Sequence, residues 1–302
     1  MLKAIWKSPF VRYLRQTPLF QLGLAIVIFW TFAALLAPVV VPYSPTKPHP
    51  DSILQPPSAR FWLGTDKDGM DIFSRVLYAP RIDLGIAVTS TAIASVLGVL
   101  VGTLAGYFLG RGGVLGLCAE WSMRAVDVIQ AFPVFIFALA LVAMLGASTL
   151  NIILAMVFVN TPVFIWLTRS EVLSVRQKPF VEAARCSGNG EMRIALVHVL
   201  PNSLAPALTQ LSVVLGFAIL LTAGISFIGA GVRVPTPEWG VMVSQGASVM
   251  ITGQWWVGLF PGLALASAVF GFALVGDSLR NFIDPKRRIA GVSGVAPVTQ
   301  AP

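Results

Sequence analysis

The sequence predicts an all-α integral membrane protein with about six transmembrane helices. Of its 302 residues, 56% are hydrophobic and only 11% are charged, and the mean hydropathy is +0.80. A soluble domain carries about 25% charged residues, more than twice this share. The apolar residues also fall into stretches of roughly the length that crosses a bilayer. These stretches are residues 22–41, 84–109, 129–144, 150–167, 205–228 and 255–276.

The first apolar stretch, residues 22–41, is predicted to be a retained helix and not a cleaved signal peptide. Signal peptides have an apolar core of about 7–15 residues, and Pro38 directly after Ala37 makes a poor cleavage site. Two interpretations of the preceding residues 1–21 stay open: a leader that fixes orientation, and a segment that lies along the inner membrane surface. Their charges are all basic: Lys3, Lys7, Arg12 and Arg15.

Residues 42–83 are rich in proline and polar side chains, which predicts a long exposed loop. Together with the first helix it would form an N-terminal unit of residues 1–83. The acidic run that starts at Asp66 partly matches a calcium loop. An EF-hand needs an oxygen ligand at position five and glycine at position six. Counting from Asp66, these positions hold Met70 and Asp71, so we expect no metal site.

The second apolar stretch, residues 84–109, is marked by glycine at every fourth position. A glycine stripe lets another helix pack closely, whereas glycine facing lipid would only lower helix propensity. We therefore expect this stripe at a helix–helix contact in the centre of the bundle. Its members are Gly98, Gly102, Gly106 and Gly110.

The chain after this stretch, residues 111–124, is predicted to be a short polar turn. Arg124 and Asp127 are three residues apart and can pair on one helix face, so we expect an interfacial ion pair and not a substrate site. The apolar stretches themselves contain no Asp, Glu, Lys or Arg. The uncharged polar residues that could line a weakly selective pathway include Asn160, Gln210 and Ser226.

Residues 171–210 form the only long polar and charged segment between strongly apolar ones in the second half of the chain. Glu182-Ala183-Ala184 precedes Gly188, which can take the left-handed conformation that ends a helix. His198-Val199-Leu200-Pro201 marks the next boundary. This order predicts two short helices joined by a glycine break, with small alanines that a partner can approach closely. We expect residues 171–202 to dock a water-soluble protein.

The last third of the chain adds two predicted irregular segments. Residues 229–254 are predicted to be an extended loop that includes Pro237-Glu238-Trp239-Gly240. Residues 286–302 are predicted to be a disordered cytoplasmic tail. The transmembrane unit between the N-terminal unit and this tail would then span residues 84–285.

The charges predict the orientation of the chain. With a cytoplasmic N-terminus, fifteen of the 21 Lys and Arg residues lie on the cytoplasmic side, as do the C-terminus and residues 171–202. The six outer bases are balanced by six outer acids, so the net charge of +8 belongs to one side. This is the distribution that the positive-inside rule requires, and it replaces nucleic-acid binding as the reason for the charge. Cys118 and Cys186 lie at or near this reducing side, consistent with free thiols.

Several motifs together resemble the permease subunits of ATP-binding cassette (ABC) importers, in particular the C-type permease of the dipeptide and oligopeptide branch. The most specific is the "EAA" loop, matched by Glu182-Ala183-Ala184, Gly188 and the His-x-Leu-Pro of residues 198–201. The resemblance covers about residues 17–285. The further matches are Leu63-Gly64-Thr65-Asp66, Met123-Arg124 with Asp127, Pro237-Glu238-Trp239-Gly240, and Gly276-Asp277 with Leu279-Arg280 and Asp284-Pro285. Met70, Val234 and Asn281 depart from the family patterns.

The resemblance implies a type I importer permease fold in a bacterial inner membrane. It implies a second, related permease subunit, two ATP-binding subunits and an extracytoplasmic substrate-binding protein as partners. ATP and Mg²⁺ would be bound by the ATPases, so no cofactor is expected in this chain. It also implies that Ala183 and Ala184 fit a groove on the ATPase, that Glu182 makes a polar contact, that Gly188 forms the turn and that Pro201 fixes the exit. Residues 237–240 would face the binding protein.

Other classes fit the residues less well. No lysine follows a glycine, so the chain lacks a P-loop and its energy must come from another protein. Ser226 is not in a nucleophile elbow, and His49 and His198 are assigned to opposite sides, which argues against a hydrolase or a zinc site. The uncharged spans argue against a secondary transporter. A membrane receptor or scaffold stays open, as does import of glutathione, opines, nickel complexes or oligosaccharides.

Overall fold

The computed structural model describes residues 17–283, and the regular elements of this part are all helical. The predicted all-α membrane fold is therefore confirmed. The calls on residues 1–16 and on the tail 286–302 lie outside the described residues. The long helices are α3 (Pro18–Val40), α5 (Pro80–Phe108), α6 (Val114–Gln130), α7 (Val134–Leu145), α8 (Thr149–Val175), α11 (Ala205–Phe227), α12 (Trp239–Met250) and α13 (Trp256–Ile283). The short ones are η1 (Pro50–Ser52), α4 (Ile72–Tyr78), α9 (Pro179–Cys186), α10 (Glu191–Arg193), η2 (Ile194–Val199) and η3 (Pro201–Ser203).

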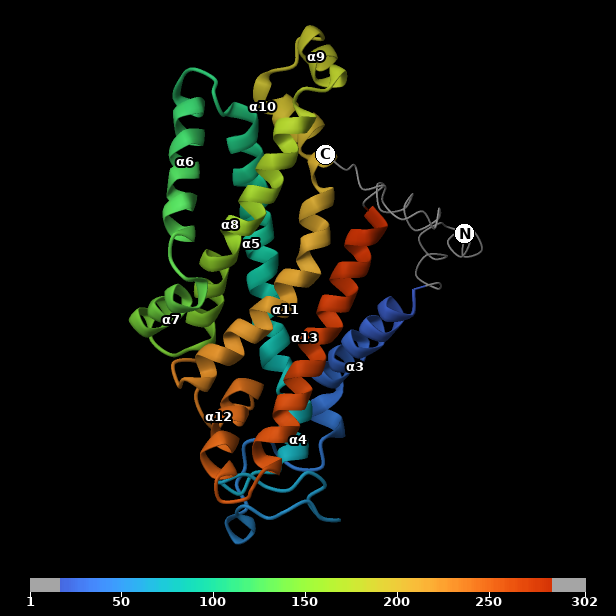
Figure 1. Ribbon diagram of the computed structural model, residues 1–302, viewed down its shortest axis with the longest axis vertical. Helices are drawn as coiled ribbons and strands as arrows, with labels where there is room; N and C mark the ends of the chain where they lie inside the picture. The colour runs from blue at the N-terminus through green and yellow to red at the C-terminus, as the bar shows by residue number, and fades with distance from the viewer. Residues whose placement is uncertain (1–16, 284–302) are drawn as a thin grey trace, which may run out of the picture.

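The helices form an elongated bundle (Figure 1). α9 and its flanking turns project from one end of the bundle, and α4 with the segment before it closes the other end. Five helical segments are long and apolar enough to cross a membrane, namely α3, the continuous pair α4–α5, α8, α11 and α13. These spans agree with the predicted ones, although α8 and α13 continue beyond the predicted ends at residues 167 and 276.

The third predicted span is wrong as a single straight helix. Its apolar residues belong to α6 and α7, which meet at an angle of 94°. Pro133 lies between them as the N-cap of α7, and proline both lacks an N–H and keeps the residue before it out of the helical conformation. The predicted polar turn at residues 111–124 is also wrong, because most of it forms the first turns of α6.

Three of the four stripe glycines lie where α5 packs against α8. A Cβ added at Gly98 would lie 2.4 Å from Phe164 Cβ, and one added at Gly102 would lie 2.6 Å from the carbonyl oxygen of Ile165. Gly106 also faces α8, and a Cβ added there would lie 2.9 Å from Val172 Cβ. The prediction is wrong for Gly110, which follows the end of α5 with a φ of +75° and has open space around it. Its role is to turn the chain after the helix.

The predicted ion pair between Arg124 and Asp127 is not formed in the described part of the chain. The guanidinium of Arg124 instead lies over the ring of Trp121, 5.3 Å from its centroid. Both partners of this pair lie on the exposed face of α6. The cation is thus held against the electron-rich face of the indole and not by a carboxylate.

The segment between α3 and α5 is a packed cap and not the exposed loop that its prolines predict. Phe61 is fully buried, and the buried Arg75 side chain holds the cap together. One guanidinium nitrogen donates to the carbonyls of Pro45 and Pro235, both at 3.0 Å, and Nε lies 3.5 Å from a carboxylate oxygen of Asp66. Burial raises the pKa of Asp66, and the Arg75 charge opposes this rise. Arg75 thus joins the cap to the segment around Pro235, which lies 160 residues later in the chain.

Candidate coupling site

The candidate coupling site is the helical hairpin formed by α9, α10 and η2 at the projecting end of the bundle (Figure 1). It contains the two short helices and the glycine break that the sequence predicts. The segment begins later than expected, because residues 171–175 still belong to α8. Arg176, directly after α8, donates from one nitrogen to the carbonyls of Gly106, Tyr107 and Leu109 at 2.9–3.2 Å. It therefore joins the base of the hairpin to the end of α5.

α9 has one buried and one exposed face. Val181 and Ala184 are buried and belong to an apolar cluster with Ile194 and Val199 of η2. Glu182 and Ala183 are exposed on the other face. The expectation that both alanines are free for a partner is therefore wrong for Ala184, whose small side chain allows the two arms of the hairpin to pack. Ala183 is the alanine that a docked protein can reach.

The turn after α9 is a Schellman motif, the helix ending in which a left-handed residue redirects the chain. Gly188 has a φ of +77° and open space around it. Its N–H donates to the Arg185 carbonyl at 3.0 Å, and the N–H of Asn189 donates to the Ala184 carbonyl at 3.3 Å. The Asn189 side-chain amide donates to the same carbonyl at 3.0 Å. Glycine is favoured here because L side chains meet a steric penalty at this φ.

Glu191, the first residue of α10, ties the hairpin to the bundle. Its carboxylate accepts hydrogen bonds from the hydroxyl of Tyr107 and from the guanidinium groups of Arg111 and Arg185, the latter from Nε at 2.9 Å. The Arg185 and Tyr107 hydrogen bonds, with Arg111 contributing, lower the pKa of Glu191 to about 2. The Arg111 guanidinium also lies over the Tyr107 ring, 4.3 Å from its centroid. One carboxylate thus joins α9, α10 and the end of α5.

The exit of the hairpin holds the remaining residues of the predicted motif. His198 and Leu200 are half-buried in and after η2, and the carbonyl of His198 accepts from the Asn202 side chain at 2.7 Å. Pro201 is exposed and begins η3, the short turn that leads into α11. Leu200 lies on an apolar groove between α5 and α11. The described residues contain no group of three or more His, Cys, Asp or Glu that could hold a metal ion.

Sequence reasoning missed the cluster around Glu191. Its members come from three separate segments, and the sequence signal is only that a tyrosine and several arginines stand at predicted helix ends. The cluster consists of Tyr107, Arg111, Arg176, Arg185 and Glu191.

The other end of the bundle holds the residues expected to face a binding protein. The prediction of an extended loop at residues 229–254 is wrong for its second half, which forms α12. Glu238 and Trp239 are fully buried, and Pro237 and Gly240 are buried as well. Glu238 is the N-cap of α12 and accepts from the N–H groups of Gly240 and Val241 at 2.9 and 2.7 Å. The motif is therefore part of the packed interior at this end of the bundle, and its side chains are not exposed to a partner.

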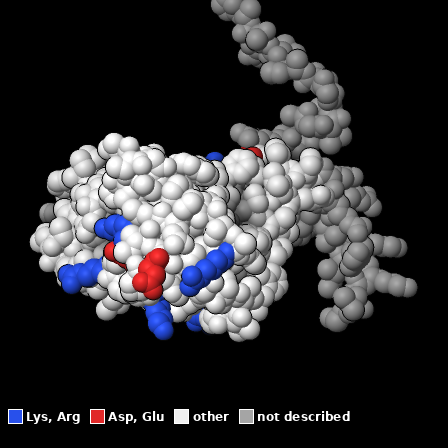
Figure 2. Space-filling view, turned by 90° about the horizontal axis from the view of Figure 1, so that it is seen from below, with Lys and Arg blue, Asp and Glu red and all other residues white. Residues whose placement is uncertain are grey.

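The cap end of the bundle is seen in Figure 2, where Lys, Arg, Asp and Glu are scattered over a largely uncharged face. Both signs of charge occur, but bases outnumber acids among the exposed residues, because Asp66, Asp71, Asp83 and Glu238 are buried. The exposed charged residues of the cap and its flanks include Lys47, Asp51, Arg60, Lys67, Arg81 and Arg233.

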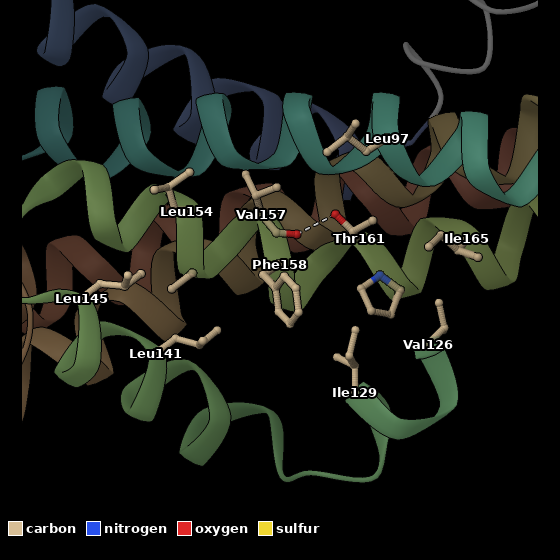
Figure 3. Close-up of a pocket in the computed structure, with 12 residues that line it drawn as sticks. Leu97, Val126, Ile129, Leu141, Leu145, Leu154, Val157, Phe158, Thr161 and Ile165 are labelled. Carbon is tan, nitrogen blue, oxygen red and sulfur yellow. Dashed lines mark hydrogen bonds between the residues drawn. The ribbon is translucent and has the colours of Figure 1, made fainter. Parts of the chain in front are cut away.

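A long apolar groove of about 400 Å³ runs along α8, opposite the α6–α7 bend (Figure 3). Phe158 points into it, between Leu141 and Ile129, and the Thr161 hydroxyl bonds the Val157 carbonyl at 2.6 Å. No charged side chain lines the groove.

The uncharged residues expected along a pathway lie elsewhere. Asn160 and Ser226 are 2% exposed and lie inside the helix packing of this chain. Gln210 is half-buried and accepts a 3.3 Å hydrogen bond from the exposed Arg280.

The fold and the hairpin together define an all-α membrane permease subunit, and comparison with known proteins specifies its family. The model of the family described as binding-protein-dependent transport system inner membrane component matches residues 98–289, more than half of the chain. A second model, described as the N-terminal transmembrane domain of oligopeptide transport permease C, matches residues 6–57. The chain therefore belongs to the family of inner membrane components of binding-protein-dependent transport systems.

Individual relatives span nearly the whole chain. A dipeptide transport system permease protein of Alkalihalophilus pseudofirmus is 38% identical over 94% of this chain and 90% of its own length. A di/tripeptide transport system permease protein of Pseudomonas aeruginosa is 39% identical over 89% of this chain and 88% of its own. A glutathione transport system permease protein of Pectobacterium atrosepticum is 34% identical over 93% of this chain and 91% of its own.

Proposed function

We propose that this chain is a permease subunit of an ABC importer that forms the translocation path for dipeptides and oligopeptides. A binding protein delivers the solute from outside the membrane, and ATP hydrolysis on separate subunits drives the transport. The observation that supports this most directly is the projecting hairpin, which exposes Glu182 and Ala183 and is fastened to α5 through Glu191. A surface for a soluble partner is thereby coupled to the transmembrane helices.

Coupling would work through two sets of contacts at the base of the hairpin, those of Glu191 and those of Arg176. An ATPase contacts the exposed face of α9 and moves it when the nucleotide sites close. Glu191 passes this motion to Tyr107 and Arg111 at the end of α5, and Arg176 passes it from the end of α8 to the same place. The close packing of α5 on α8 lets the two helices move as one body, because there is no space for them to slide into. The bundle then alternates between inward-open and outward-open states.

The partners follow from the same proposal. The bound ATP and Mg²⁺ belong to two ATP-binding subunits, and this chain supplies no cofactor site. A second, related permease subunit completes the path. The apolar groove along α8 supports such a partner, because its walls offer a helix about 400 Å³ of uncharged space. The cap and the turn before α12 form the surface that meets the substrate-binding protein.

The proposed orientation places the N- and C-termini and the α9 hairpin in the cytoplasm of a bacterial cell. The hairpin end supports this, because Arg169, Arg176, Lys178, Arg185 and Arg193 outnumber the acids there, Glu171, Glu182 and Glu191. At the other end, acids and bases balance. The positive-inside rule assigns the basic end to the cytoplasm.

The proposed cargo is a peptide, and a second solute class has one specific observation in its favour. The two relatives with the highest identities given above are named for dipeptide and di/tripeptide transport. The relative named for glutathione transport shows that proteins similar to this chain also serve a modified peptide. Glutathione is therefore the alternative that the experiment must separate.

The test is ATP hydrolysis by the assembled transporter. The chain is co-expressed with its candidate permease and ATPase partners and reconstituted in liposomes with the binding protein. A mixed pool of dipeptides and tripeptides is expected to stimulate hydrolysis and peptide uptake. Stimulation by glutathione alone would keep the transporter and replace the cargo. Failure to bind any ATPase would overturn the proposal and favour a receptor or scaffold.

Two substitutions at one residue test the docking surface. Ala183→Trp adds bulk to the exposed face of α9 without entering the apolar cluster, so we expect it to lower ATPase stimulation and uptake at least ~10-fold. Ala183→Ser keeps the small size and is expected to retain activity. Equal activity of the two variants would show that the partner does not approach α9 closely.

A further inference from the structure

Two buried carboxyl groups meet at the outer end of the bundle. Asp83, in the first turn of α5, is 2% exposed, and Glu238, the N-cap of α12, is 0% exposed. Both carboxyls lie at the first turn of α12, where Asp83 accepts from the N–H of Trp239 at 3.2 Å and Glu238 accepts from the N–H groups of Gly240 and Val241. In the described part of the chain neither carboxyl takes part in an ion pair. Burial of two negative charges side by side without a cation is strongly unfavourable.

Donors and acceptors decide which carboxyl is neutral. Glu238 accepts from the N–H groups of Gly240 and Val241 at 2.9 and 2.7 Å. These donors, at the positive end of α12, favour the ionised form of Glu238. An ionised carboxylate has no proton to give, so a hydrogen bond between these neighbouring side chains requires that the other carboxyl supply the proton.

Asp83 can supply that donor. One of its oxygens accepts from the backbone N–H of Trp239 at 3.2 Å, which leaves the other oxygen for Glu238. We propose that Asp83 carries a proton and donates it in a hydrogen bond to ionised Glu238, so that this shared proton fastens the start of α12 to α5.

The residues around the Asp83–Glu238 pair are tightly packed, so the shared proton stabilises the contact between α12 and α5. Trp239 packs edge to face on Trp30 with 4.9 Å between ring centroids, and its indole N–H donates to the Val76 carbonyl at 3.2 Å. The backbone of Gly240 lies against Ala223 of α11 too closely for a Cβ. The pair therefore lies where α3, α4, α5, α11 and α12 converge, and removing its proton places two charges in that packed junction.

The charged groups of the neighbouring elements are all engaged elsewhere or exposed. On α4, Arg75 bonds the Pro235 carbonyl and Asp66, and in the cap Asp68 accepts from Gln245 of α12 at 3.0 Å. Arg81 on α5 and Arg233 before α12 are exposed. The described residues of α3, α11 and α12 carry no charge. Titration in this junction therefore belongs to the Asp83–Glu238 pair.

The direct test is infrared spectroscopy of the full-length protein in lipid. At pH 8 a carbonyl band of a buried protonated carboxyl is expected, and it should be missing from Asp83→Asn. The band should disappear when the wild type is titrated to alkaline pH. A spectrum in which Asp83→Asn removes no such band at pH 8 would overturn the proposal, and this arm does not depend on activity.

Thermal unfolding of the same protein gives the second test. Asparagine mimics the neutral acid, because its amide can donate to Glu238 and its oxygen can accept from Trp239. At about pH 4, where the unfolded aspartate also begins to hold its proton, the Tm of Asp83→Asn is expected to lie within about 2 °C of the wild-type value, and at pH 7 the variant is expected to be the more stable protein. The wild type holds a proton that the unfolded chain releases, so its Tm falls as the pH rises, and Asp83→Asn should flatten this slope.

The matched control is Asp66→Asn, a second aspartate at the same end, whose partner is the Arg75 cation. Removing its charge leaves Arg75 buried without an anion, so this variant is expected to lower Tm at pH 7. Equal destabilisation by Asp83→Asn and Asp66→Asn, with a wild-type pH slope that Asp83→Asn leaves unchanged, would show that Asp83 is ionised and would overturn the proposal.

Discussion

The carboxylate of Glu191 accepts a hydrogen bond of 2.9 Å from Nε of Arg185, and through it the two arms of the projecting hairpin are held together. The same carboxylate reaches Tyr107 and Arg111 at the end of α5. A displacement of α9 is therefore transmitted to the end of α5 through the hydrogen bonds of Glu191. Four predictions test the Glu191 contacts, the packing of α5 on α8 and the buried Arg75 of the cap.

Replacing Glu191 with glutamine should loosen the hairpin. The amide keeps the shape but loses the charge that holds two arginines, so we expect backbone amide exchange over residues 179–193 to become about 3–10-fold faster, and uptake in the reconstituted transporter to fall. Hydrogen exchange with mass spectrometry checks the first result. Glu182→Gln is the control, because Glu182 is exposed and its side chain has no hydrogen bond or ion pair in the described residues. Equal exchange in both variants would contradict the role of Glu191.

The Glu191 contacts should also weaken in acid. The pKa of Glu191 is lowered from its ordinary value of 4.5 to about 2, so its carboxylate stabilises the fold above pH 4.5 and this contribution is lost as the pH falls toward 2. The side chain is 40% exposed, so solvent screening limits the contribution to about 1 kcal/mol at most. The difference in Tm between wild type and Glu191→Gln should therefore be constant above pH 5 and shrink below pH 4. A difference that grows in acid would show that the sign is wrong.

Crowding at the α5–α8 contact should make a methyl group costly. In Gly98→Ala the new Cβ would lie 2.4 Å from Phe164 Cβ, so the helices must separate, at a cost of about 1–3 kcal/mol. Gly85 lies on the same helix, is exposed and has nothing within 4 Å, so Gly85→Ala should be neutral or stabilising. Thermal unfolding in detergent compares the two. Similar Tm values would mean that α5 and α8 are farther apart than described.

The buried Arg75 should be the most sensitive residue of the cap. Arg75→Met leaves Asp66 as a buried carboxylate without its cation, which costs about 3–5 kcal/mol. Adding Asp66→Asn to this variant removes the unpaired charge and should restore part of the loss. Arg81→Met, at an exposed arginine of the same end, is the control and should have little effect. The free energy of unfolding of the three variants is compared. Recovery in the double variant indicates that Arg75 stabilises the cap by pairing with Asp66, whereas no recovery indicates only a loss of contact area.

Local sequence signals predicted the hairpin well, because each signal acts within a few residues. Gly188 ends α9 by its own backbone freedom, and Pro201 marks the exit whatever lies around it. The same logic failed for Ala184, whose partner face is the other arm of the hairpin. It also failed at Glu238 and Trp239, where a polar and proline-rich motif suggested exposure although the tertiary packing buries it.

The sequence by itself determined the class of the molecule, the approximate spans and the place of the hairpin. These follow from hydrophobicity, charge and backbone preference, which are properties of short segments. Only the tertiary structure decided that α6 and α7 bend apart, that the cap is packed around Arg75, that Tyr107 and Arg111 meet Glu191, and that Asp83 meets Glu238. Each of these depends on contacts between residues far apart in the chain, and the free energy of such a contact exists only once the helices are packed together.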